Sequence, residues 1–217
     1  MPSRRPARIY ILAGVNGAGK SSIGGAMFAA AGVAFLNPDL AARRFLHAQP
    51  GISQADANGA AWHEGRRLLE RAIHENLDFA LETTLGGTTI ASLLAEAAAR
   101  GHEVRVWYVG LASKELHVAR VRSRVARGGH DIPEAKIHER YASSRLRLIA
   151  LLPILAELRL FDNSAEGDPA AGHLPAPKFL LHLKRGKVVS LCDLQSVPDW
   201  AKPIVQAALQ YSTRLRK

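Results

Sequence analysis

The stretch GVNGAGKS at residues 14–21 fits the phosphate-binding pattern G-x-x-x-x-G-K-[ST] at every fixed position. In such a loop the backbone N–H groups turn around an anion, the lysine reaches the β- and γ-phosphates of a nucleotide, and the Ser or Thr hydroxyl binds Mg²⁺. The segment RIYILA at 8–13 predicts a buried strand before the loop, and residues 20–31 predict a helix after it. This order places the phosphates at the positive N-terminus of a helix. The expected nucleotide contacts are Gly14, Asn16, Gly17, Ala18, Gly19, Lys20, Ser21 and Ser22.

Length and composition are those of an ordinary globular protein. The chain has 217 residues, of which 47% are hydrophobic and 22% charged. We expect one domain over residues 1–217, with a core at about 8–164 and a C-terminal appendage at about 177–217. No segment approaches the run of about 20 apolar residues that spans a bilayer, and the single cysteine, Cys192, cannot form an intrachain disulfide. We therefore expect a cytoplasmic protein without a membrane partner.

The net charge of +10 comes from 29 basic and 19 acidic side chains, and the basic ones are mostly arginine. Arginine binds phosphate through a planar pair of parallel hydrogen bonds, so the charge fits nucleotide substrates or a nucleic acid. A GC-rich genome that favours arginine codons would give the same composition. Charge alone therefore decides little, and it leaves a nucleic-acid partner open without favouring it.

Strands and helices alternate after the loop. The predicted strands are 8–13, 33–36, 79–81, 104–109 and 158–162, and the predicted helices are 20–31, 40–47, 54–76, 88–99, 114–126 and 133–151. Residues 163–176 predict a surface loop, 179–183 and 187–191 predict a hairpin, and 200–215 predict a last helix. This alternation predicts an α/β protein with the three-layer P-loop NTPase fold: a mostly parallel sheet flanked by helices, with a C-terminal β-hairpin and helix.

Polar side chains follow the second and third predicted strands, at the carboxyl edge where open α/β sheets bind ligands. Asp39 is placed to accept the proton of an acceptor hydroxyl, as a base does in phosphoryl transfer. The alternative is that Asp39 caps the helix beginning at Leu40. Glu82 is a candidate ligand of Mg²⁺ or of the acceptor hydroxyl, and Thr83 and Thr84 are candidate substrate contacts. The alternative for these three is an ordinary solvated strand end.

A third group of candidates is basic. Arg120, Arg124 and Arg127 are spaced four and three apart, so they share one face of the predicted helix. Like charges on one face repel unless an anion lies between them, and phosphoryl transfer needs cations around the moving group. We expect Arg124 and Arg127 to act in catalysis with Lys20 and Asp39. Residues 128–133 predict a lid, and the expected substrate contacts in this region are Arg120, His130 and Arg140. A solvated basic face is the alternative.

Taken in order along the chain, these motifs resemble the zeta toxin family, and in particular its chromosomal branch of P-loop ATPases or kinases. The resemblance covers about residues 8–164. The motifs that carry it are residues 14–22, Asn37-Pro38-Asp39, Glu82-Thr83-Thr84-Leu85, the stretch from Arg124 to His130 with Pro133, Arg140-Tyr141, and Phe161-Asp162-Asn163-Ser164.

The resemblance implies a kinase that uses Mg²⁺ and ATP. In zeta toxins the acceptor is UDP-N-acetylglucosamine, phosphorylated on the sugar 3′-hydroxyl. Carried over, Lys20 and Ser21 would hold phosphate and Mg²⁺, Asp39 would be the general base, and Glu82 with Thr84 would position the sugar nucleotide. Arg124 or Arg127 would steady the transferred phosphoryl group. The toxins have glycine after the acidic position, where this chain has Thr83.

Two other functions stay open at this stage. One is a kinase acting on polynucleotide 5′-hydroxyls, for which the positive charge would be the electrostatic footprint. The other is a nucleotide-binding regulatory protein, paired with an antitoxin protein and without useful catalysis. A small-molecule kinase is favoured over both. This choice depends on the predicted site residues and not on the fold, because one fold supports many functions.

Overall fold

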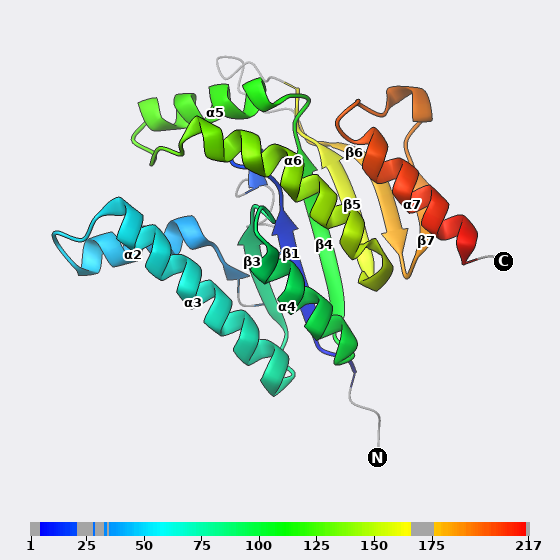
Figure 1. Cartoon of the computed structure of the whole chain (residues 1–217), viewed down its shortest axis with the longest axis horizontal. Helices are drawn as coiled ribbons and strands as arrows, with labels where there is room; N and C mark the ends of the chain where they lie inside the picture. The colour runs from blue at the N-terminus through cyan, green and yellow to red at the C-terminus, as the bar shows by residue number, and fades with distance from the viewer. Residues whose placement is uncertain (1–4, 21–27, 29–32, 34, 166–175, 216–217) are drawn as a thin grey trace.

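The computed structural model describes residues 5–20, 28, 33, 35–165 and 176–215. Ser21, Ser22 and most of the predicted helix 20–31 lie outside the described residues, as does most of the predicted loop 163–176. Figure 1 shows the arrangement of the elements.

The strands form one seven-stranded sheet in the order β2-β3-β1-β4-β5-β6-β7. The first five strands along this order pair in parallel, and the pairings β5–β6 and β6–β7 are antiparallel. The strands are β1 (Arg8–Ala13), β2 (Phe35–Leu36), β3 (Phe79–Thr83), β4 (Glu103–Gly110), β5 (Glu157–Asp162), β6 (Lys178–Lys184) and β7 (Lys187–Leu191). The predicted α/β class, the mostly parallel sheet and the C-terminal hairpin are confirmed.

The helices lie close to the predicted ranges. They are α2 (Pro38–Ala48), α3 (Gln54–Glu75), α4 (Thr88–Ala99), α5 (Lys114–Ala126), α6 (Glu134–Leu151) and α7 (Lys202–Arg214), with short 3-10 turns at Leu152–Ile154 and Leu194–Ser196. The hydroxyls of Ser53 and Ser113 cap α3 and α5, because they accept backbone N–H groups at the starts of these helices. Asn76 ends α3 in the left-handed conformation.

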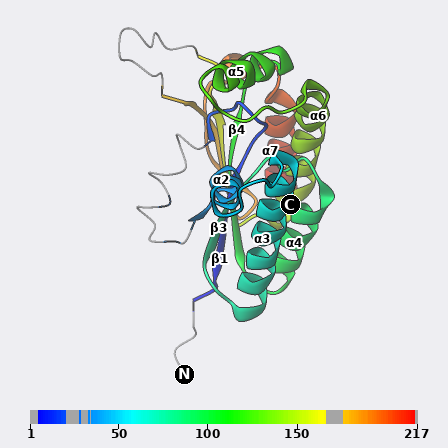
Figure 2. The same cartoon turned by 90° about the vertical axis from the view of Figure 1, so that its left-hand side faces the viewer.

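Apolar faces of α3, α4, α6 and α7 cover one side of the sheet, as the edge-on view in Figure 2 shows. The main core lies between these helices and the sheet, and the strands contribute alternate residues to it, such as Ile9, Ile11 and Val106. On the opposite side, the ring of Phe28 packs with Tyr10 and Trp107 in a second cluster. Within the described ranges, no helix combines the length and the apolar character that crossing a bilayer requires.

The C-terminal segment joins the same sheet and the same core. β6 pairs with β5, and Ile204, Val205 and Ala208 of α7 belong to the main core cluster. The β6–β7 turn has positive φ at both central residues, 46° at Arg185 and 75° at Gly186, which matches the twist of a two-residue hairpin. The parallel strands end together at the upper edge in Figure 1, below α5. The loop after β1 and the residues after β2, β3 and β5 therefore meet at one place.

Candidate active site

The glycines of the loop after β1 are required by its backbone. Gly14, Gly17 and Gly19 have φ values of 143°, 83° and 82°, a region that residues with a side chain rarely adopt. A Cβ atom on Gly17 would lie 2.7 Å from the carbonyl oxygen of His117, and one on Gly14 would collide with the carbonyl oxygen of Val109. The loop conformation therefore depends on the fixed glycines of the phosphate-binding pattern.

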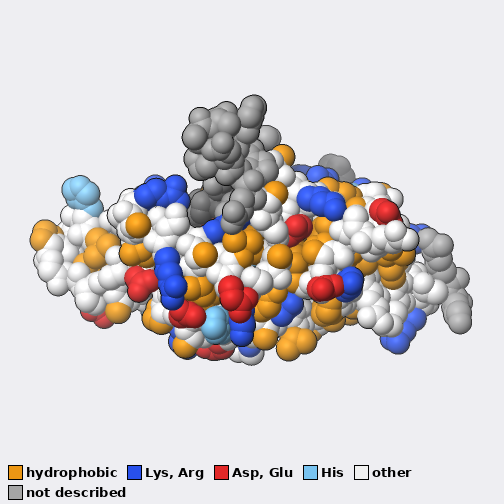
Figure 3. All heavy atoms as spheres, turned by 90° about the horizontal axis from the view of Figure 1, so that it is seen from above, with side chains coloured by type: hydrophobic (Ala, Val, Ile, Leu, Met, Phe, Trp, Pro, Cys, Tyr) orange, Lys and Arg blue, Asp and Glu red, His pale blue; other side chains and the backbone are white. Residues whose placement is uncertain are grey.

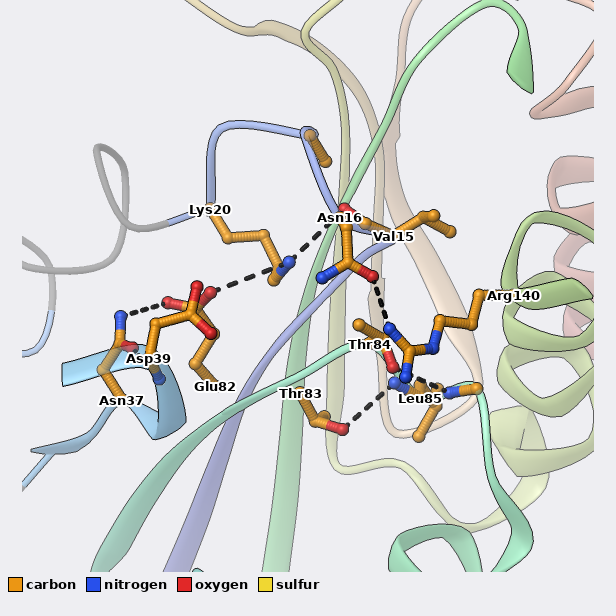
Figure 4. Close-up of polar contacts among 12 residues, drawn as sticks. Val15, Asn16, Lys20, Asn37, Asp39, Glu82, Thr83, Thr84, Leu85 and Arg140 are labelled. Carbon is orange, nitrogen blue, oxygen red and sulfur yellow. Dashed lines mark hydrogen bonds and ion pairs between the residues drawn. The ribbon is translucent and has the colours of Figure 1, made fainter. Parts of the chain in front are cut away.

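Three side chains from distant parts of the sequence hold this loop. His117 Nδ1 lies 2.8 Å from the carbonyl oxygen of Asn16, and Asn163 Nδ2 donates to the carbonyl oxygen of Ala18 at 2.9 Å. Arg140 Nη1 donates to Asn16 Oδ1 at 2.8 Å, a contact seen in Figure 4. The sequence patterns do not indicate His117 as a site residue, and they indicate Asn163 only as part of a motif. The position of Asn163 directly after the last parallel strand is the signal for its role.

His117 is neutral at physiological pH. Burial lowers its pKa to about 4, against an ordinary value of 6.5, and the nearby positive charge of Lys20 adds to this effect. Because a carbonyl oxygen only accepts hydrogen bonds, Nδ1 carries the proton in its contact with Asn16. The imidazole therefore serves as a neutral donor that fixes the loop backbone.

This buried histidine predicts an acid-sensitive stability. Between pH 6.5 and pH 4 the unfolded chain binds a proton at His117 that the folded chain does not, so stability is lost as the pH falls through this window. We expect the free energy of unfolding of the wild type to drop by about 2–3 kcal/mol more than that of His117→Gln between pH 7.5 and pH 4.5. Urea denaturation of both proteins at the two pH values measures this difference. Equal pH dependence in both would show that His117 does not titrate as a buried base.

Lys20 is buried between the loop and β3. Its Nζ donates to the carbonyl oxygen of Val15 at 3.3 Å and lies 3.6 Å from Glu82 Oε1. Burial lowers the pKa of Lys20, while the charge of Glu82 opposes this shift. Glu82 is itself buried and accepts a hydrogen bond of 2.8 Å from Asn37 Nδ2. Figure 4 shows these three side chains in a row with Asp39 beside them. The row places a cation and a carboxylate at the predicted phosphate position.

Asp39 does not cap the helix that contains it. The cap is Asn37, whose Oδ1 accepts the N–H groups of Asp39 at 2.8 Å and Leu40 at 3.2 Å. The helix begins at Pro38 and not at Leu40, because proline is favoured at the first helical position and directs the capping role to the preceding residue. The Asp39 carboxylate instead faces Arg124 and His130, with Oδ2 3.6 Å from Arg124 Nη1 and Oδ1 3.7 Å from His130 Nε2. The capping alternative is therefore wrong.

The hydroxyls of Thr83 and Thr84 shape the turn after β3. They accept backbone N–H groups of Leu85 at 3.0 Å and Gly86 at 3.4 Å. Leu85 is buried with a φ of 53°, a left-handed conformation that is unusual for leucine. Ser144 on α6 donates to the carbonyl oxygen of Thr84 at 2.7 Å and holds the turn in place. Both threonines still line the central cleft.

The four predicted arginines all line the cleft, but their contacts differ. Arg124 Nη2 donates to the carbonyl oxygen of His130 at 3.0 Å, so this guanidinium joins the backbone of His130 to Asp39. Arg127 bends back along α5 and donates to the carbonyl oxygen of Ser123 at 3.2 Å. Arg120 donates to the carbonyl oxygen of Ala165, and Arg140 reaches Asn16. Burial lowers the pKa of His130, which leaves Arg124 as the charged partner of Asp39 near neutral pH.

A cleft of about 1320 Å³ opens beside Lys20 and Asp39 and continues towards α3. The cleft is also lined by residues that the sequence patterns do not indicate: Asn58, Gly59, Trp62, Gly65 and Arg66 of α3, with Lys136 and Glu139 of α6. Trp62 is 41% exposed, although tryptophan is normally well buried. The cleft therefore has a phosphate end at the loop and an aromatic, partly charged end on α3.

The residues around Lys20 fit a magnesium ion that is shared with a nucleotide. In the part of the chain that the structure describes, no group of three or more His, Cys, Asp or Glu side chains is placed to hold a metal ion. Mg²⁺ in phosphoryl-transfer sites needs no such cage, since one or two carboxylates, water and the phosphates supply its oxygen ligands. Glu82 offers such a carboxylate at the strand edge.

The sheet order, the glycine loop after β1 and the buried lysine together define a P-loop kinase-like protein. The sequence model described as "Zeta toxin" matches residues 1–165, so the chain belongs to the zeta toxin family. The resemblance found in the motifs is thereby confirmed. A protein of Haemophilus influenzae with uncharacterized function is 30% identical over 128 residues, which cover 59% of this chain and 88% of that protein.

Solved structures show the same fold at low sequence identity. The AvrRxo1-ORF1:ORF2 complex crystallised with ATP has a TM-score of 0.65 and 16% identity, covering 93% of this chain and 63% of that one. The chain therefore spans less than two thirds of the length of that relative. A chain of the PezAT chromosomal toxin–antitoxin system of Streptococcus pneumoniae has a TM-score of 0.53 and 14% identity, covering 99% of this chain and 89% of that one.

Proposed function

We propose that this protein is an ATP-dependent kinase that transfers the γ-phosphoryl group to a hydroxyl of a small molecule. The observation that carries the proposal is that Lys20 on the phosphate loop and Asp39 after β2 line the same cleft, where burial lowers the pKa of Lys20 and the charge of Asp39 is close enough to act against that shift. A cation for the phosphates and a base for the acceptor are the two groups that phosphoryl transfer needs close together. Membership of the zeta toxin family and the fold of an ATP-bound relative support it.

In the proposed reaction the loop and Lys20 hold the triphosphate. The acceptor hydroxyl oxygen attacks the γ-phosphorus, the bond from that phosphorus to the β–γ bridging oxygen breaks, and ADP leaves. Asp39 accepts the hydroxyl proton, and Arg124 stabilises negative charge on the moving group. Mg²⁺, when bound, would neutralise phosphate charge, and the residues that would hold it are Glu82 and Ser21, with Ser21 outside the described residues.

The contacts of Arg124 and Arg127 at the end of α5 predict that these two catalytic candidates differ. Arg124 faces Asp39, whereas Arg127 bonds to its own helix. We expect Arg124→Ala to lower kcat by about 10²–10³-fold, because one preorganised charge on the transferred group is lost. Arg127→Ala should change kcat by no more than roughly threefold, as an exposed charge does. Steady-state kinetics of the two variants is the measurement, and a larger loss in Arg127→Ala would reverse the assignment.

The acceptor end of the cleft favours a substrate with a flat ring and an anionic group. Trp62 offers an exposed aromatic face for a sugar or a base. Arg66 and Lys136, which are ion-paired with Glu70 at 2.7 Å and Glu139 at 3.0 Å, are the cations that a phosphate would engage there. UDP-N-acetylglucosamine, the acceptor of the zeta toxins, has this chemistry. It is therefore the first acceptor to test.

Trp62 gives a specific test of this acceptor position. We expect Trp62→Ala to raise the KM for the acceptor about tenfold, since stacking on a ring contributes roughly 1–3 kcal/mol. The KM for ATP should stay within about twofold, because Trp62 lies on α3 and not on the phosphate loop. Trp107→Phe is a control for a tryptophan outside the cleft. An unchanged acceptor KM would place the acceptor elsewhere.

The experiment that tests the proposed function is a screen with radiolabelled ATP. The purified chain is incubated with Mg²⁺-ATP and, separately, with sugar nucleotides, nucleosides and oligonucleotides. Label on a sugar nucleotide or nucleoside supports the proposal. Label only on oligonucleotides would instead show a polynucleotide kinase. Bound ATP with no transfer to any acceptor would contradict catalysis.

Two observations bear on the other functions. Among the described residues visible over the carboxyl ends of the strands, acidic and basic side chains are interspersed (Figure 3), which does not favour a polynucleotide acceptor. The AvrRxo1-ORF1:ORF2 structure is a complex of two proteins, and the PezAT structure comes from a toxin–antitoxin system. An antitoxin protein is therefore a candidate partner of this chain. Size-exclusion chromatography with the product of a neighbouring gene would test it.

A further inference from the structure

Trp200 joins the C-terminal segment to the edge of the sheet that carries the site. It precedes α7 and is 3% exposed. Its Nε1 donates to Asp162 Oδ1 at 2.9 Å, at the end of β5. Its ring lies directly against Gly110 at the end of β4, where an added Cβ atom would lie 2.7 Å from Cζ2. The tryptophan thus contacts the ends of two parallel strands at once.

Asp162 is directly followed by Asn163, one of the three residues whose side chains hold the phosphate loop. Asp162 Oδ1 also accepts the hydroxyl of Ser164 at 2.5 Å, and Ser164 Oγ accepts the N–H group of Ala112 at 2.7 Å. Between them, the backbone N–H group of Asn163 donates to the carbonyl oxygen of Gly110 at 3.0 Å. With its backbone fixed from both sides, Asn163 donates from Nδ2 to the carbonyl oxygen of Ala18 in the loop.

A second chain of contacts runs from Trp200 to the turn after β3. The rings of Trp200 and Tyr108 stack with centroids 6.2 Å apart, and the Tyr108 hydroxyl lies 3.0 Å from Ser144 Oγ. Ser144 uses its single hydroxyl proton on the carbonyl oxygen of Thr84, so Tyr108 is the donor to Ser144. This route ends at the Thr84 turn on the cleft, and the first route ends at the nucleotide loop.

We propose that Trp200 is a positioning residue for nucleotide binding: the C-terminal hairpin and helix fix the phosphate loop through Trp200, Asp162 and Asn163. The residues of β6, β7 and α7 lie beyond the range 1–165 that matches the family. Preorganisation of a loop raises affinity because less conformational freedom is lost on binding. The inference rests on the proposed function in one respect, which is that ATP is the ligand of the loop.

The test measures ATP affinity of the full-length chain by calorimetric titration. Trp200→Phe keeps an apolar ring but removes the indole donor, and we expect ATP to bind roughly five- to twentyfold more weakly. Asn163→Ala, which removes the last contact of the route, should have an effect at least as large. Tyr211→Phe is the matched control, because it deletes a hydrogen bond from the same C-terminal segment to Pro153. It should bind ATP within about twofold of the wild type.

A double-mutant cycle separates positioning from general loss of packing. If Trp200 acts through Asn163, the variant with Trp200→Phe and Asn163→Ala together should bind ATP no more weakly than Asn163→Ala alone. Fully additive losses, or wild-type affinity in Trp200→Phe, would overturn the proposal. Should Trp200→Phe fail to fold by circular dichroism, Asp162→Ala breaks the same link from the strand end and must show the same coupling. A wild-type chain that binds no ATP would refute the proposed function itself, which is a different result.

Discussion

Replacing Asp39 by asparagine should leave ATP binding intact and abolish most phosphoryl transfer. Asparagine keeps the size of the side chain but cannot accept the proton of the acceptor hydroxyl. Because a positioned general base contributes about 10²–10⁴-fold to rate, we expect kcat to fall by that factor. The cap of α2 is Asn37 and not Asp39, so the helix should be unaffected. The measurement is initial-rate kinetics with labelled ATP, together with calorimetric titration of ATP.

The matched control is Glu139→Gln, which neutralises another carboxylate that lines the same cleft. Glu139 is paired with Lys136 at 3.0 Å, and both side chains are largely exposed. We expect its kcat to remain within about threefold of the wild type, since exposed ion pairs contribute little. If Asp39→Asn turned over as fast as this control, Asp39 would be removed from the mechanism and a different base would be needed.

The parts of the fold that follow from local sequence signals were predictable. The phosphate loop is defined by glycine spacing, and the helix starts at Ser53 and Ser113 follow from capping chemistry. Alternating strands and helices place the residues after parallel strands at one edge, which is why Lys20 and Glu82 could be predicted to lie together. The helix α2 starts two residues before the predicted Leu40, because proline at the first helical position leaves Asn37 as the cap.

The supports of the loop could not be predicted from spacing. His117 and Asn163 are 101 and 145 residues from the backbone groups they bind, and these contacts depend on how α5 and β5 are placed against β1. Helical periodicity correctly put Arg124 and Arg127 on the cleft side, but it does not fix the end of a long, flexible side chain. That is why one guanidinium faces Asp39 and the other returns to Ser123. Trp200 was missed because its partners lie on strands far away in sequence.

Replacing Lys20 by methionine should remove ATP binding as well as transfer. Lys20 is the buried cation at the loop, held at 3.3 Å from the carbonyl oxygen of Val15 and 3.6 Å from Glu82. Bound phosphates would provide negative charge in place of these contacts, so the ammonium group would bind the β- and γ-phosphates. Methionine keeps the apolar stem and loses this charge. We expect ATP affinity to fall at least about tenfold and kcat to fall by about 10²–10³-fold.

Lys20→Met also removes a cation from beside the buried Glu82 carboxylate, so some loss of stability is expected in addition to the loss of binding. The double variant with Glu82→Gln separates the two effects. It removes the buried charge while Asn37 can still donate to the remaining carbonyl oxygen. We expect the melting temperature of the double variant to recover towards that of the wild type while ATP binding stays lost. Full ATP affinity in Lys20→Met would show that the loop does not bind phosphate through this lysine.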